Sequence, residues 1–324
     1  MSLRPVHSPA IFAITVLAVA CGPQLNASPR AAVPGVDPVS GALESVEVEL
    51  PGAELSQVRG PAGMVLVGAS IDAGRSVGGV APECSLRKIS NVSNVAQAAT
   101  LRCAALLGAY ATLERARAFL LSAGAESFTP APILAELRSV DAAASDQVLL
   151  PGLRYLPSAD AFTLSSGPAG ARVPAALNPG AVTREFSRRQ LRALAEQHPD
   201  EAEGIALFLG AAASGDPGYL ASSEAHGDPR GELDLSRPLS AEASATSIVA
   251  GALWAWSDAS GDAVGAARAA LAAARALSAS RDGRDREAGP TALLSLVAEQ
   301  LDGADRDQAC AVFRAHAGRL PACP

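Results

Sequence analysis

The chain of 324 residues is 49% hydrophobic but only 4% aromatic and 18% charged, and 71 of its residues are alanine. This length and apolar content suit one large domain or two lobes and exclude a largely disordered protein. A net charge of −7 argues against a nucleic-acid-binding surface, and four histidines leave little material for a histidine-rich metal site. We therefore expect no nucleic-acid partner, no metal and no other cofactor.

The first twenty residues have the pattern of an export signal. Arg4 precedes the apolar run Ala10–Ala20, which is too short to span a bilayer as a mature helix but has the length of a signal-peptide core. The run ends in Leu17-Ala18-Val19-Ala20-Cys21. This segment resembles a bacterial lipobox, which is cut before a cysteine that then carries lipid, although its leucine lies one position further from the cysteine than usual. Ordinary signal cleavage at the same bond would also fit and would leave Cys21 free.

The four remaining cysteines indicate an oxidising compartment. They are even in number, and none belongs to the closely spaced Cys-x-x-Cys pair that is typical of metal sites. Three pairings are possible. We expect the local one, Cys84–Cys103 with Cys310–Cys323, which closes two short loops that stabilise the fold by ~3 kcal/mol each.

In chain order, the predicted elements change from strands to helices. After the signal peptide (residues 1–20), the Pro- and Gly-rich residues 21–43 predict a lipidated cysteine followed by a flexible tether. Strands are predicted at 46–50, 64–67, 148–150 and 161–164, and an Ala-rich helix is predicted over 94–123 with a stop at Gly124. Beyond Asn178, helical patterns cover 180–197, 200–214, 243–256, 261–279, 290–302 and 306–318.

This order predicts an α+β fold. We expect a β-containing N-terminal lobe over residues 44–177 and a mainly α-helical C-terminal lobe over residues 178–324.

One segment of the predicted helical lobe carries a recognisable spacing. The helix after Asn178 contains Arg184-Glu185-Phe186-Ser187-Arg188, and Glu203-Gly204-Ile205-Ala206-Leu207-Phe208 follows fifteen residues later. A zinc-peptidase helix uses His-Glu-x-x-His because histidines four residues apart share one face and jointly hold the ion. Here arginines occupy both histidine positions.

These segments resemble the gluzincin peptidases, the thermolysin and fungalysin kind, in order as well as in spacing. An upstream helix (residues 109–119) and a downstream helix (residues 248–254) are also similar to that family. The resemblance covers about residues 105–275 and implies a metallopeptidase-like fold. It assigns Glu185 to the base position and Glu203 to the third-ligand position. Leu207 replaces the usual aspartate, and the gap before Glu203 is short.

Zinc chemistry does not follow from this resemblance. A guanidinium group has no lone pair to offer a metal and stays protonated, so Arg184 and Arg188 would repel Zn²⁺. Without the ion, Glu185 has no activated water to deprotonate. We therefore expect a pseudo-peptidase that is not an enzyme, with no catalytic residues at the degenerate positions Arg184, Glu185, Arg188 and Glu203.

Two interpretations of the charged segment remain open. If the fold is kept, Arg184 or Arg188 should lie near Glu203, so that a guanidinium takes the place of the ion and ties two helices together. Alternatively, these charges are a solvated helix face with i,i+4 pairs.

The sequence as a whole predicts an exported bacterial lipoprotein, anchored in a membrane of the cell envelope through Cys21 and facing the periplasm or the exterior. Its expected role is non-catalytic, either binding a peptide or envelope protein or supporting the envelope. The alternatives are a hydrolase or peptidase of unrecognised mechanism and a disulfide-stapled helical adaptor without peptidase ancestry.

Overall fold

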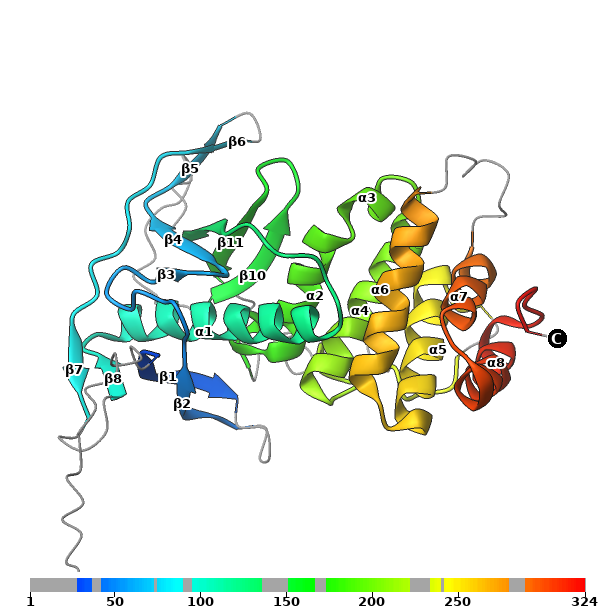
Figure 1. Cartoon of the computed structure of the whole chain (residues 1–324). Helices are drawn as coiled ribbons and strands as arrows, with labels where there is room; N and C mark the ends of the chain where they lie inside the picture. Colours follow the sequence, from blue (N-terminus) through cyan, green and yellow to red (C-terminus); the bar gives the residue numbers. More distant parts are fainter. Residues whose placement is uncertain are drawn as a thin grey trace, which may run out of the picture.

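The computed structural model describes residues 28–36, 42–72, 75–89, 95–135, 151–166, 173–221, 234–239, 242–279 and 289–323. Apart from one long helix within the first half, the described helices follow the described strands along the chain, so the fold is α+β (Figure 1). The lipobox, Cys21 and the predicted strand at 148–150 lie outside the described residues.

The first half forms two main sheets. The order of the first is β2 (Leu43–Glu49), β1 (Arg30–Val36), β8 (Val95–Ala98) and β7 (Leu86–Lys88). The order of the second is β10 (Pro151–Leu156), β11 (Ala161–Ser166), β9 (Ala131–Ala135), β4 (Gly63–Val67) and β3 (Arg59–Gly60). β11, β9 and β4 are parallel, whereas β10 and β3 run antiparallel to their neighbours. A separate hairpin pairs β5 (Ser70–Asp72) with β6 (Arg75–Val77).

Helix α1 (Leu101–Ser122) lies between the two sheets (Figure 1). It contacts β1 and β8 on one side and β4 on the other. Its residues from Ala105 to Glu114 are all buried, as expected of a helix covered all round.

The second half is a helical layer that continues from the short 3-10 helix η1 (Ala175–Leu177). It comprises α2 (Pro179–Gln190), α3 (Arg192–Ala195), α4 (Pro199–Ser214), α5 (Ala245–Ser260), α6 (Ala263–Ala279), α7 (Pro290–Glu299) and α8 (Gly303–Ala317). Helix α4 is central, with α2, α3, α5 and α6 packed against it. One continuous apolar core extends from Ala31 in β1 to Phe313 in α8.

Two sequence-based predictions in the first half are wrong. Residues 30–36 of the predicted tether form β1, because Ala31, Ala32 and Val33 are buried between β2 and β8. The helix predicted from residue 94 begins only at Leu101. Residues 95–98 pair as β8, and the Thr100 side chain caps the helix by accepting from the Cys103 amide.

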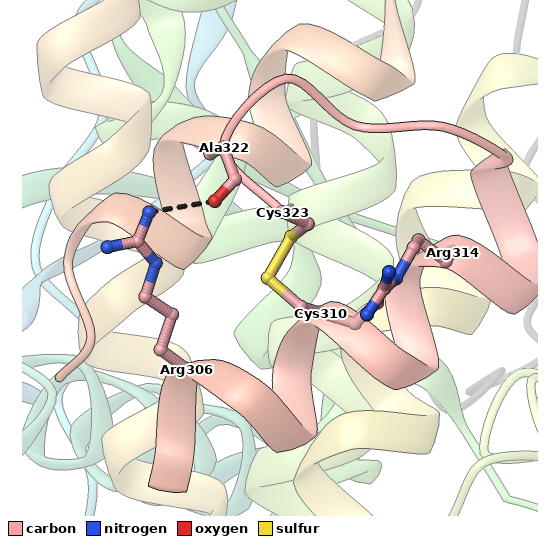
Figure 2. The surroundings of a disulfide bond; sticks show 5 residues. All are labelled: Arg306, Cys310, Arg314, Ala322 and Cys323. Carbon is pink, nitrogen blue, oxygen red and sulfur yellow. Dashed lines mark hydrogen bonds between the residues drawn. A yellow bond between two sulfur atoms is a disulfide. The ribbon is translucent and has the colours of Figure 1, made fainter. Parts of the chain in front are cut away.

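The cysteines outside the signal region form the two predicted disulfides. Cα–Cα distances are 5.6 Å for Cys84–Cys103 and 5.4 Å for Cys310–Cys323, within the usual range. The second disulfide holds the C-terminal tail against α8 (Figure 2). Arg306 of that helix also donates a hydrogen bond of 2.7 Å to the carbonyl of Ala322 (Figure 2).

Candidate functional site

The helix that carries the degenerate motif is fixed at its first turn. Asn178 precedes α2, and its side-chain oxygen accepts from the amides of Gly180 (3.0 Å) and Ala181 (3.2 Å). Its side-chain nitrogen donates to the carbonyl of Tyr219 at 2.8 Å. The cap therefore sets both where α2 begins and how it lies on the segment that follows α4.

Two glycines allow α2 and α4 to approach closely. A Cβ at Gly180 would lie 2.5 Å from the ring of Tyr219, and a Cβ at Gly210 would lie 2.6 Å from the carbonyl of Gly180. Neither position has room for a larger residue. The side chains further along α2 consequently lie within reach of α4.

Both arginines of the motif bind one carboxylate on α4. Arg184 donates from Nε to Oε1 of Glu203 at 2.8 Å, and its second terminal nitrogen, Nη2, contacts the same oxygen. Arg188 donates to both oxygens of Glu203, each at 2.8 Å. The guanidinium–carboxylate contact between two helices, which was one of the two interpretations of this segment, is therefore present.

The second acidic residue of the motif is also fully engaged. Glu185 is buried, with 6% of its surface exposed. One oxygen accepts from Arg188 at 2.6 Å and the other accepts from the backbone amide of Tyr155 in β10 at 2.8 Å. Glu185 therefore ties α2 to the edge of the second sheet, while Glu203 ties α2 to α4. We call Arg184, Glu185, Arg188 and Glu203 the ionic cluster.

The surroundings of Glu203 and Arg188 favour the charged form of each side chain. Burial alone raises the pKa of Glu203, but hydrogen bonds and charge from Arg188 and Arg184 outweigh it, so that the pKa lies below its usual value. Burial alone lowers the pKa of Arg188, but Glu203 and Glu185 outweigh it and raise that pKa.

A neighbouring ion pair was not anticipated from the sequence. Arg189 binds Asp160 through two hydrogen bonds of 2.8 and 2.9 Å and also donates to the carbonyl of Thr129. Tyr155 donates its hydroxyl to Asp160 at 2.9 Å, and burial together with this bond raises the pKa of Tyr155 to about 12. Asp160 lies in the turn between β10 and β11, 29 residues from Arg189. No local spacing links such distant residues.

A cavity of about 670 Å³ opens beside the ionic cluster. β10 and the turn after it form one wall with Arg154, Tyr155 and Ser158, while α2, α3 and the start of α4 form the other. Arg188 and Glu203 reach into its lining, and Leu191 and Ala202 supply part of its apolar surface. The volume lies within the range of ligand-binding clefts.

The donor set does not fit a zinc ion. Arginines occupy the two positions at which the resemblance places histidine ligands, and both donate to Glu203. The negative charge of Glu203, at the third-ligand position, is therefore already neutralised. His198 is buried at the start of α4, and His316 lies on α8, where it contacts the carbonyl of Val312. His226 lies outside the described residues. In the part of the chain that the structure covers, no three side chains of His, Cys, Asp or Glu converge to hold a metal.

Comparison with known proteins does not assign the chain to a family. No model of a known protein family matches the chain, and no curated protein matches it. Among the described helices, none combines the length and the apolar composition needed to cross a bilayer. The functional argument therefore depends on the geometry of the site.

Proposed function

We propose that this protein is an exported lipoprotein whose peptidase-like body is non-catalytic and binds a peptide or protein segment at the cell envelope. The observation that carries the proposal is that guanidinium groups donate hydrogen bonds to Glu185 and Glu203. These are the two carboxylates to which the resemblance assigns the chemistry, and every oxygen of both already accepts at least one hydrogen bond.

The state of Glu185 argues against peptide hydrolysis. A general base must reach the proton that it removes with a lone pair that is available. Glu185 is buried, does not line the cavity, and already accepts hydrogen bonds on both oxygens, from Arg188 and from the amide of Tyr155. A hydrolase of another mechanism would need a different set of residues, and a helical adaptor would need no cleft.

The lining of the cavity supports a peptide as the ligand. β10 is the edge strand of its sheet among the described strands, with β11 as its neighbour. The outward amide of Tyr155 in this strand already donates to Glu185 of α2, so a peptide would lie in the cavity between β10 and the helices rather than add to the sheet edge. The cavity combines apolar surface with arginine side chains, which suits a peptide that carries both apolar and charged side chains.

Metal and cleavage measurements test the non-catalytic part. We expect purified protein to contain no stoichiometric zinc and to leave casein intact after overnight incubation with added Zn²⁺. Casein cleavage that a chelator abolishes would contradict the proposal, and cleavage that resists the chelator would favour the hydrolase alternative.

Peptide binding tests the remaining part. We expect fluorescein-labelled peptides from a casein digest to bind, as measured by anisotropy, and Ser158→Trp to weaken binding because the new ring would enter the cavity from its rim. The exposed Ser56, which is outside the cavity lining, provides the control Ser56→Trp. Absence of binding would leave the adaptor alternative.

Lipidation at Cys21 is tested separately. Wild-type protein expressed in a bacterium should incorporate radiolabelled palmitate and partition into detergent, because two or more acyl chains give stable membrane attachment. Cys21→Ser should remove both properties. Equal labelling of the two proteins, or none in either, would rule out the anchor.

A further inference from the structure

We infer that the cavity beside β10 selects acidic peptide segments. This inference rests on the proposed binding function and assigns a ligand chemistry to it. The whole chain carries a net charge of −7, yet the walls of this cavity have the opposite sign.

A charge count shows the reversal. The cavity is lined by Arg154, Arg188 and Arg192 on the positive side and by Glu196 and Glu203 on the negative side, a surplus of one positive charge. The residues immediately behind this lining do not cancel the surplus. In the ionic cluster, Arg184 and Arg188 balance Glu185 and Glu203, and Arg189 balances Asp160 through its two hydrogen bonds.

Two of the lining arginines remain accessible to a ligand. Arg154 is exposed on β10 and forms no ion pair with another described residue. Arg192 lies 3.6 Å from Glu196, and their side chains are 51% and 69% exposed. This contact is therefore weak, and a ligand carboxylate can replace Glu196 as the partner of Arg192. Arg188, in contrast, is held by Glu203 and Glu185.

The placement of Arg154 puts positive charge on the wall of the cavity that β10 forms. Along β10, Tyr155 is buried and its neighbour Arg154 is exposed, so successive side chains alternate between the two faces of the sheet. A peptide in the cavity would pass Arg154 on β10 and Arg192 on α3, which line it from opposite walls. A carboxylate on such a peptide can accept hydrogen bonds from guanidinium, whereas an amide would lack the charge.

A pair of matched peptides tests the inference. The probes are fluorescein-labelled Val-Glu-Val-Glu-Val-Glu and Val-Gln-Val-Gln-Val-Gln, each blocked at the free terminus, with binding measured by anisotropy at pH 7. We expect the acidic peptide to bind about fivefold more tightly, the effect of one or two partly exposed ion pairs. The preference should fall as salt is raised to about 0.5 M.

Arginine variants locate the source of the preference. Arg154→Gln combined with Arg192→Gln should remove the preference for the acidic peptide and leave binding of the neutral peptide unchanged. Arg87→Gln is the control for the loss of one positive charge away from the cavity. Arg87 is exposed on β7, at the far end of α1 from the cavity (Figure 1). Thermal unfolding of each variant shows that it is folded.

The outcomes separate this inference from the proposed function. Equal affinity of wild-type protein for both peptides overturns acidic selectivity and leaves the binding function standing. A preference that persists in the double variant also overturns it, since the charge would then lie elsewhere. Binding of neither peptide overturns both.

Discussion

Glu203 is the residue on which the ionic cluster depends. Its side chain is 25% exposed and receives hydrogen bonds from two guanidinium groups, which are 23% and 31% exposed. Desolvation of such a group offsets much of the Coulomb attraction, so the cluster contributes little net stability relative to an apolar core. Breaking it is a different matter, because a partly buried charge then loses its partner.

Removal of the carboxylate should therefore be costly. We expect Glu203→Ala to lower the free energy of unfolding by about 3 kcal/mol, because two guanidinium groups would be left around one buried carboxylate, that of Glu185. Urea unfolding gives the value. Glu196→Ala, on an exposed pair, is the control and should change stability by less than about 1 kcal/mol. If Glu203→Ala lowers the free energy of unfolding by an equally small amount, the ionic cluster does not stabilise the fold.

Low pH should weaken the contact of Glu203 with the two arginines. The pKa of Glu203 in the folded protein lies below the value of 4.5 for a free side chain, so its contribution to stability is complete above pH 4.5 and declines as pH falls through the folded pKa. Unfolding free energies measured between pH 7 and pH 3 should fall less steeply for Glu203→Gln than for wild-type protein. Glu196→Gln should retain the wild-type slope, and a slope unchanged in Glu203→Gln would contradict the assignment.

The site was only partly predictable from residue spacing. Arg184 and Arg188 are four residues apart on one helix, so their shared face followed from helical geometry alone. Their convergence on Glu203 followed from the order of motifs. The pairing of Arg189 with Asp160 did not, because a hairpin turn and a helix meet there only through tertiary packing.

Among the elements, helices were easier to predict than strands. The helices after Asn178 occur close to their expected places because Ala- and Leu-rich runs are bounded by Pro and Gly. β1 contains Pro34 and Gly35, which locally indicate a loop. Within β1, only Arg30–Ala32 pair with β8, so Pro34 lies beyond the part of β1 that has two strand neighbours. A strand of this kind is defined by distant partners, which local composition does not reveal.

The cap of α2 allows a test at this scale. We expect Asn178→Ala to lower the free energy of unfolding by about 1–2 kcal/mol, because two amides of the first turn and the carbonyl of Tyr219 would lose a buried partner. Asp302 precedes α8 without any side-chain capping bond, so Asp302→Ala is the matched control and should have a smaller effect. Equal losses, measured by urea unfolding, would show that the cap does not determine the position of α2.

At the scale of the whole molecule, a continuous core occupies the middle and a disulfide lies near each end. Cys84–Cys103 joins the start of α1 to the segment before β7, and Cys310–Cys323 joins α8 to the tail (Figure 1). The tail has little core of its own, with Leu320 and Cys323 as its buried apolar side chains among the described residues after α8.

The C-terminal disulfide should therefore contribute measurably to stability. Replacing both partners, Cys310→Ser with Cys323→Ser, should lower the free energy of unfolding by about 3 kcal/mol, since the unfolded chain gains the freedom of an open loop. The control is wild-type protein with a reducing agent, which should unfold at lower urea concentration than the double variant because it loses both disulfides. A double variant as stable as oxidised wild-type protein would show that the tail is held by packing alone.

The shared carboxylate of Glu203 also determines how the protein tolerates mutation. If Arg184 is replaced, Arg188 still donates to both oxygens, and if Arg188 is replaced, Arg184 still contacts one of them. Loss of both removes every charged partner that the described residues offer to Glu203, so the two substitutions are not additive. Arg188 is also the charged partner of the buried Glu185, so position 184 is buffered against a single change, whereas positions 188 and 203 are not. Mutational drift in the ionic cluster is consequently tolerated at position 184 and resisted at positions 188 and 203.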